Sequence, residues 1–268
     1  MQKRQALTFF PPSQQGGKMN NGLLSTVQEN ALFVVEFLAI VLLMFVIAYA
    51  FEKFFKKKTG DTERILSTRK IAFIGMFAAI AAILHVLDFP VFFAPSFYKM
   101  DFSELPALIG AFAFGPVAGV MIEFVKIVLK LLFKGTSTAF VGDLANFVVG
   151  CSFLLPASIL YQANKKKKIA IISCVVGTLC MTVVGTTFNA VYLLPAFSKL
   201  YGMPLDVIIG MGTAINSAIT GVVSFVILAV APLNLLKGSV ISIITLLVYK
   251  KISPILKASH RDNGKSKA

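Results

Sequence analysis

The sequence predicts an all-α, polytopic membrane protein with a core of six helices and one additional transmembrane helix in front of it. Two observations support this fold class. The chain is 57% hydrophobic with a mean hydropathy of +0.82, whereas soluble domains are about 45–50% apolar. Several apolar runs also reach the roughly 20 residues that a helix needs to cross the hydrocarbon core of a bilayer. These runs lack the alternation of apolar and polar residues that a transmembrane β-barrel requires.

The net charge of +14 is distributed as in a membrane protein and not as in a nucleic-acid-binding protein. Lysines cluster beside hydrophobic runs at 56–58, 165–168 and 250–251. Short basic loops mark the cytoplasmic side of a membrane protein, and they also contact anionic lipids. We therefore predict a multi-pass protein of the cell membrane, in contact with the lipid bilayer and without a nucleic-acid partner.

The N-terminal part is predicted to contain a disordered segment (1–30), an additional transmembrane helix (31–52) and a cytoplasmic linker (53–70). The first 22 residues are polar and rich in Pro, Gln and Gly, which is typical of disorder. The lysines follow the first apolar run and do not precede it, so an uncleaved anchor fits better than a signal peptide. Its N-terminus is then outside. Glu36 in this helix is interpreted as interfacial, with pairing to another subunit as the alternative.

The membrane core is predicted over 71–257, followed by a cytoplasmic tail at 258–268. Its six helices are expected at Ile71–Asp88, Ser103–Phe114, Val117–Phe133, Asp143–Tyr161, Ile169–Leu194 and Leu233–Lys250. Gly115-Pro116 separates the second from the third, and Pro195 ends the fifth.

The last third of the chain needs a topology argument. The lysine clusters before and after it are both expected inside, so an even number of crossings must separate them. Three apolar runs intervene, so one of them should not cross. The run 207–231 is diluted by Gly, Ser, Thr and Asn, and we predict that it is a folded or re-entrant segment on the outer side. The C-terminus is then cytoplasmic.

Two patterns in the predicted core helices concern packing. Glu123 and Lys126 are three residues apart, so they share a helix face and are expected to form an ion pair. Ala78 and Ala82 are four residues apart on the first core helix. Small residues at this spacing allow a second helix to approach closely, either within the chain or from another protein.

The segment 89–100, FPVFFAPSFYKM, is predicted to be an aromatic loop at the membrane surface. Pro90 and Pro95 prevent a continuous helix, because each removes a backbone donor and restricts the preceding residue. Such a loop is suited to cover a flat, apolar ligand. The alternative is an interfacial belt, in which aromatic residues gather without a ligand.

Four polar residues are expected to meet this loop at the outer end of the bundle: Asp101, Asn189, Asn234 and Lys237. Amide and ammonium groups can bind the edge of a ring that carries N–H and C=O groups. Other roles remain open for each. Asn234 could cap a helix, Lys237 could extend to the interface, and Asn189 could bond to a neighbouring helix.

The sequence contains no recognisable catalytic or metal-binding motif, so we predict a non-enzyme without a metal or cofactor. Its three cysteines have no zinc-binding or redox spacing. His85 with Asp88 is the only starting point for an intramembrane enzyme, and no nucleophile accompanies it. The chain has no G-x-x-x-x-G-K-[ST] motif, so hydrolysis of ATP through such a loop would have to come from a partner.

Three motifs of the predicted core are distinctive: DFSELPALIGAFAFGPVAG at 101–119, GTSTAFVGDLAN at 135–146 and PLNLLKG at 232–238. Together they resemble those of the riboflavin-binding S components of energy-coupling-factor (ECF) transporters. The resemblance covers about 70–257 and not the additional N-terminal helix, to which it assigns no role. It implies a subunit that captures riboflavin from outside, as a transported ligand and not a cofactor. It also implies three partners, a transmembrane coupling subunit and two ATPase subunits.

The resemblance implies roles for individual residues. Three match positions that contact the isoalloxazine ring: Asn189, Asn234 and Lys237. Four match the loop that closes over the ligand: Tyr98, Lys99, Met100 and Asp101, although the family often has a smaller residue in place of Lys99. Ala78 and Ala82 match a motif that contacts the coupling subunit. The main alternative is an S component for another vitamin, such as thiamin or folate, and a structural membrane protein is a further one.

Overall fold

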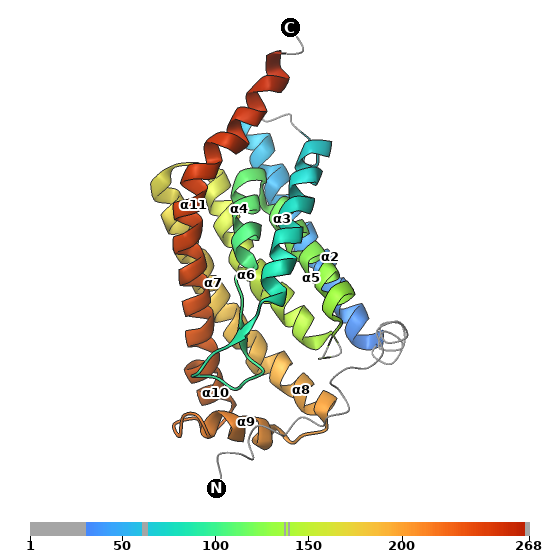
Figure 1. The fold of residues 1–268 in the computed structure, drawn as a ribbon, viewed down its shortest axis with the longest axis vertical. Coiled ribbons are helices and arrows are strands. Elements are labelled where there is room, and N and C mark those ends of the chain that lie inside the picture. Colours follow the sequence, from blue (N-terminus) through green and yellow to red (C-terminus); the bar gives the residue numbers. More distant parts are fainter. Residues whose placement is uncertain (1–30, 61–63, 137, 139, 266–268) are drawn as a thin grey trace.

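The computed structural model describes residues 31–60, 64–136, 138 and 140–265, and these residues are predominantly helical (Figure 1). The predicted disordered segment 1–30 lies outside them. The helices are α2 (Ala31–Thr59), α3 (Thr68–Val86), α4 (Glu104–Phe114), α5 (Pro116–Lys134), α6 (Val141–Ala163), α7 (Lys167–Phe188), α8 (Leu194–Tyr201), α9 (Leu205–Thr213), α10 (Val222–Phe225) and α11 (Ala231–Lys265). Two π-helical turns interrupt them, η3 (Asn189–Leu193) and η4 (Val226–Val230).

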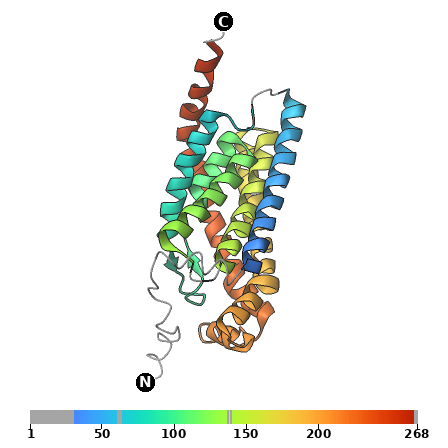
Figure 2. The same cartoon turned by 90° about the vertical axis from the view of Figure 1, so that its right-hand side faces the viewer.

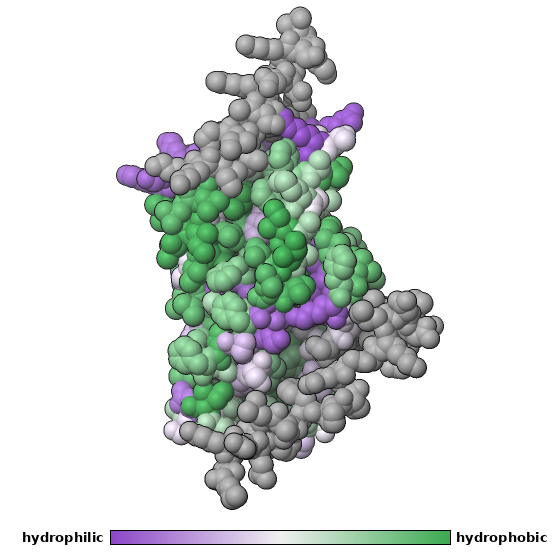
Figure 3. All heavy atoms as spheres, in the orientation of Figure 1, coloured by the Kyte–Doolittle hydropathy of each residue, from purple (hydrophilic) through white to green (hydrophobic). Residues whose placement is uncertain are grey.

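The predicted fold class, an all-α polytopic membrane protein, is confirmed. Within the described residues, 5 helices are long and apolar enough to cross a membrane: Ala31–Lys58, Thr68–Val86, Val141–Ala163, Lys167–Tyr201 and Val222–Tyr249. α5 has 19 residues but carries several charges, and α4 has only 11 residues. Figure 3 shows a wide hydrophobic surface around the helices, with hydrophilic residues above it.

The break between the second and third core helices lies where the sequence predicts it. Gly115 follows α4 with a φ of 110°, a conformation that glycine adopts without strain. Pro116 is the first residue of α5, where its missing N–H has no helical partner to lose.

Pro195 and Pro232 lie inside helices, although the sequence predicts one helix to end before Pro195 and another to begin directly after Pro232. Pro195 does not end the fifth core helix, because α7, η3 and α8 form one continuous helix from Lys167 to Tyr201. The last core helix begins at Val222, not at Leu233, and contains Pro232 after η4. A π-helical turn precedes each proline and widens the helix, which relieves the clash between a proline ring and the carbonyl one turn earlier.

The run 207–231 does not form a separate crossing, as predicted. Its first part is the short helix α9, which lies at the end of the molecule opposite the lysine clusters (Figure 1). Its second part, from Val222, belongs to the last long helix. The expected re-entrant segment is therefore only the first half of this run.

α2 packs along α5 and α6 on one side of the bundle, and Figure 2 shows it at the edge of the core. It continues to Thr59, so the lysines at 56–58 are helical and not part of an irregular linker. α3 packs against α5 on the other side.

Ala78 and Ala82 lie on the inner face of α3, with exposed fractions of 0% and 4%. Ala78 packs in a core cluster with Leu108 and Ile122. Of the two roles that the sequence leaves open for Ala78 and Ala82, this structure supports internal packing, and contact with a coupling subunit stays a prediction.

Candidate functional site

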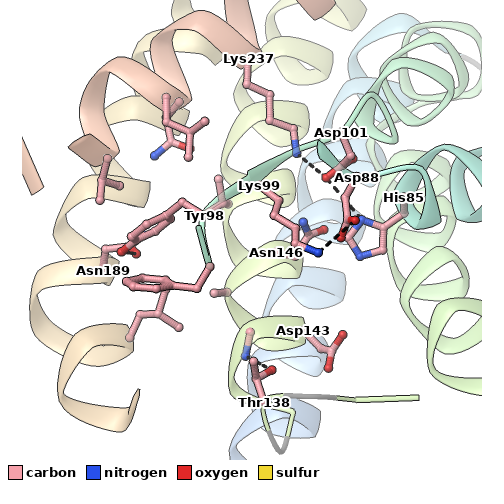
Figure 4. Close-up of a pocket in the computed structure, with 18 of the residues that line it drawn as sticks. His85, Asp88, Tyr98, Lys99, Asp101, Thr138, Asp143, Asn146, Asn189 and Lys237 are labelled. Atoms are coloured by element: carbon pink, nitrogen blue, oxygen red, sulfur yellow. Dashed lines mark hydrogen bonds and ion pairs between the residues drawn. The ribbon is translucent and has the colours of Figure 1, made fainter. Parts of the chain in front are cut away.

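A cavity of about 420 Å³ lies between the loop after α3, α6, η3 and the beginning of α11. Its volume is in the range of about 300–1,000 Å³ that is typical of small-molecule sites. The loop forms a two-stranded antiparallel hairpin of β1 (Phe89–Pro90) and β2 (Lys99–Met100), in which Phe89 pairs with Met100. Figure 4 shows how the polar residues of the loop and helices meet around the cavity.

Six of the seven predicted ligand-contacting residues line this cavity: Tyr98, Lys99, Asp101, Asn189, Asn234 and Lys237. They come from the loop, η3 and α11, which are far apart in the sequence. Met100 does not line it. Its side chain is buried in an apolar cluster with Leu193 and Phe197. A direct contact of Met100 with a ligand stays a prediction.

Tyr98 and Asn189 are directly connected. The Tyr98 hydroxyl donates to Asn189 Oδ1 at 2.7 Å, and Asn189 Nδ2 donates to the carbonyl oxygen of Gly185 at 2.7 Å. Burial raises the pKa of Tyr98 well above its ordinary value, so this hydroxyl stays protonated and able to donate. Asn189 Oδ1 has a second lone pair with which it could accept a hydrogen bond from a ligand.

Lys237 is buried and paired with two carboxylates. Its Nζ atom lies 3.1 Å from Asp101 Oδ2 and 2.8 Å from Glu104 Oε2. The side chain is only 7% exposed, so the alternative in which Lys237 extends to the interface is wrong. Since ion pairing offsets the burial of a charge, the two carboxylates fix the ammonium at the cavity wall.

Asp101 is held as a carboxylate by its surroundings. Burial alone would raise the pKa of Asp101, but the Lys237 ammonium and His85 outweigh burial and hold this pKa well below its usual range. His85 Nδ1 is 3.4 Å from Asp101 Oδ2. The backbone N–H of Ser103 also donates to Asp101 Oδ1 at 2.8 Å, which stabilises the turn before α4.

The charges continue from the cavity into the core of the bundle. Lys126 Nζ lies 3.4 Å from Glu104 Oε1 and 3.0 Å from Ser103 Oγ, and it forms the predicted ion pair with Glu123. Negative and positive groups therefore alternate from Asp101 through Lys237, Glu104 and Lys126 to Glu123. Sequence reasoning assigned Glu104 only to the start of a helix, because nothing local indicates that it meets two lysines.

A second polar group lines the side of the cavity formed by α5 and α6. Lys130 Nζ is 2.7 Å from Asp143 Oδ1. Asp143 was expected to cap its helix, but it lies within the first turn of α6, after Phe140. Asp143 Oδ2 and Asn146 Oδ1 are buried without a hydrogen-bond partner in the part of the chain that the structure describes. Such acceptors are suited to hydroxyl groups of a ligand.

A helical membrane bundle with a cavity lined by amides, a buried ammonium group and aromatic rings defines a membrane-embedded binding protein for a small polar ligand. The family model described as ECF transporter, substrate-specific component, matches residues 69–249. This chain therefore belongs to the substrate-specific components, or S components, of ECF transporters, which are transporter subunits.

Individual relatives agree with this assignment. A protein of Staphylococcus aureus named riboflavin transporter RibU is 37% identical over 189 residues, which are 70% of this chain and 93% of that protein. The riboflavin transporter FmnP of Bacillus subtilis is 31% identical over 190 residues, 70% of this chain and 94% of that protein. A solved structure described as the S component of a bacterial ECF transporter is 35% identical. It matches with a TM-score of 0.55 and covers 70% of this chain and 98% of the solved chain.

Proposed function

We propose that this protein is the riboflavin-binding subunit of an ECF transporter and that its cavity holds the vitamin. The observation that carries the proposal is the convergence of Asn189, Asn234 and Lys237 on one cavity with the aromatic hairpin. The names of the relatives from S. aureus and B. subtilis support riboflavin over another vitamin.

The residues of the cavity suit the two parts of riboflavin. Asn234 and Lys237 can bind the edge of its ring system, where C=O and N–H groups alternate. Tyr98 and Phe197 can pack against the apolar faces of the ring. The unpartnered oxygens of Asp143 and Asn146 can accept hydrogen bonds from its polyol chain.

The proposed orientation puts the lysine clusters in the cytoplasm and the cavity at the outer side of the cell membrane. The short basic segments at 56–58 and 165–168 lie at the same end of the bundle (Figure 1). Riboflavin would then enter from outside, and the hairpin would close over it. The N-terminus of α2 would lie on the outer side.

Transport needs partners in this proposal. A transmembrane coupling subunit and two ATPase subunits would supply the energy, and the S component would topple in the membrane to release riboflavin inside. The absence of a phosphate-binding loop motif from the sequence supports this division of tasks.

The first test is spectroscopic. Purified in detergent, the protein is expected to carry flavin absorbance bands, or to quench the fluorescence of added riboflavin in proportion to binding. Competition with thiamin and folate distinguishes the vitamin, and neither is expected to displace riboflavin. A colourless protein that quenches no riboflavin fluorescence would contradict the proposal, and displacement by thiamin or folate would favour the corresponding vitamin.

A further inference from the structure

The additional helix α2 lies outside the region that the family model matches. Its two glutamates, Glu36 and Glu52, nevertheless form hydrogen bonds with residues of the core. The carboxylate of Glu36 accepts a hydrogen bond from the hydroxyl of Tyr192. Glu52 Oε2 accepts the backbone N–H of Val117 at 3.0 Å, at the N-terminus of α5. Glu36 thus has a partner within its own chain and does not need another subunit for pairing, while its place near the outer interface stays a prediction.

Tyr192, the hydrogen-bond partner of Glu36, lies next to the ligand site in the chain. Tyr192 lies in η3, the same π-helical turn that begins with Asn189. The Tyr192 ring stacks on Phe188, the residue before Asn189, with ring centroids 5.0 Å apart. Tyr192 and Phe188 also pack against the cluster that contains Phe37 of α2. The part of η3 that carries Tyr192 is therefore in contact with α2.

A π-helical turn needs such support, because it contains one residue more than an α-helical turn and has poorer hydrogen bonding. If η3 became α-helical, the residues after it would shift by one position relative to the residues before it. Such a shift is a rotation of roughly 100° about the helix axis. Asn189 and Tyr192 could not then both keep their present directions. A charge-assisted hydrogen bond from Tyr192 to Glu36, in surroundings with little water, opposes this rotation.

We infer that α2 positions the ligand site: Glu36, acting through Tyr192, holds η3 in the register that directs Asn189 into the cavity. The inference rests on the proposed function, since its effect is measured through riboflavin. Glu36 and Tyr192 are positioning residues and do not line the cavity.

The test is riboflavin affinity, measured by fluorescence quenching with the full chain. Tyr192→Phe and Glu36→Leu are each expected to weaken binding about five- to tenfold, the effect of one hydrogen bond. The double variant should be no weaker than either single variant, because both remove the same bond. Glu36→Gln should retain most of the affinity, since its amide oxygen still accepts the Tyr192 proton.

Measurements in an Asn189→Ala background distinguish a positioning role from a general loss of stability. In Asn189→Ala, the change Glu36→Leu should alter the affinity by less than twofold, because no Asn189 amide remains to be positioned. The matched control is Glu52→Leu, at the other end of α2, which removes the acceptor of the Val117 N–H. It should lower the thermal midpoint and leave riboflavin affinity within twofold of the wild type.

The outcomes are distinguishable. If the wild type binds riboflavin and Tyr192→Phe binds it equally well, the positioning role is overturned. The same follows if Glu36→Leu weakens binding equally with and without Asn189. The isosteric Tyr192→Phe keeps the test valid if Glu36→Leu does not fold. A wild type without riboflavin affinity would overturn the proposed function and this inference together.

Discussion

At the scale of single residues, Lys237 combines two roles. Its ammonium group faces the cavity and is also the shared partner of Asp101 and Glu104. Removing a buried cation leaves its carboxylates uncompensated, which destabilises a protein by about 3–5 kcal/mol. The site chemistry and the stability of the fold are therefore linked at this residue.

Lys237→Met is accordingly expected to abolish most riboflavin binding and also to lower the thermal midpoint, measured by the loss of monodisperse protein on heating. Lys237→Met combined with Asp101→Asn should recover part of the midpoint without recovering binding. An unchanged midpoint in the single variant would show that the carboxylates do not depend on Lys237.

Asn234→Ala offers a cleaner probe of the ring edge. The amide is buried at 6% exposure and carries no charge, so its removal should weaken riboflavin binding by about 1–3 kcal/mol with a small effect on stability. Gly185→Ala tests the same position from the other side, because a Cβ atom there would lie 2.6 Å from Asn234 Nδ2. Both variants should bind less riboflavin in a quenching titration. Equal affinities for wild type and Asn234→Ala would remove Asn234 from the site.

The low pKa of Asp101 predicts a pH window. Because the pKa is lower in the folded protein than in the unfolded chain, the stabilising contribution of Asp101 is present above the unfolded pKa of about 4 and is lost as the pH falls below it. The difference in thermal midpoint between wild type and Asp101→Asn should be constant between pH 5 and 8 and should shrink below about pH 4. A difference in thermal midpoint that already changes between pH 8 and 6 would contradict the low pKa of Asp101.

What the sequence could predict about the site also differs residue by residue. The family resemblance indicated Asn189, Asn234 and Lys237, and the last two lie in the short motif at 232–238, which is recognisable without knowledge of the fold. Glu104, Asp143 and Asn146 lie within the other two motifs, but what they meet in the bundle depends on other helices. Which side chains meet across a bundle is a property of tertiary packing and has no local signal.

At the scale of elements, hydropathy predicts the long helices well, because lipid requires about 20 apolar residues for each crossing. The errors occur at Pro195 and Pro232, where the chain continues as helix after a π-helical turn. Such a turn adds a single residue to a helix and leaves no compositional trace. The prolines were therefore interpreted as boundaries, although proline in a membrane helix is tolerated where neighbouring groups satisfy the backbone.

The junction of α4 and α5 gives a prediction at this scale. Gly115 has a φ of 110°, and a Cβ atom there would lie 2.7 Å from the Glu52 carboxylate. Gly115→Ala should therefore destabilise the fold, by about 1–3 kcal/mol from backbone strain alone, and lower the thermal midpoint. Gly75→Ala is the matched control, because nothing lies within 4 Å of a Cβ atom at Gly75. Equal midpoints for the two variants would contradict this account of the junction.

At the scale of the whole molecule, the proposed orientation can be measured. In a background without the native cysteines, a cysteine in place of Asn216, in the exposed turn after α9, should react with a membrane-impermeant maleimide in intact cells. A cysteine in place of Lys166 should react only after the membrane is opened. The reverse labelling pattern would contradict the proposed orientation, because it would place the cavity on the cytoplasmic side.

The docking of α2 along α5 and α6 also limits the directions from which another membrane protein can approach. α2 covers part of the surface of α5 and α6, which is therefore not exposed to lipid. Another subunit cannot contact this part of the bundle while α2 is in place. Apolar side chains remain exposed on α3, including Met76, Ile80 and Ile83, and on α7, including Ile172, Val175 and Leu179. These two sectors are therefore among those open to the coupling subunit of the proposed transporter, and the additional helix restricts the directions from which that subunit could approach.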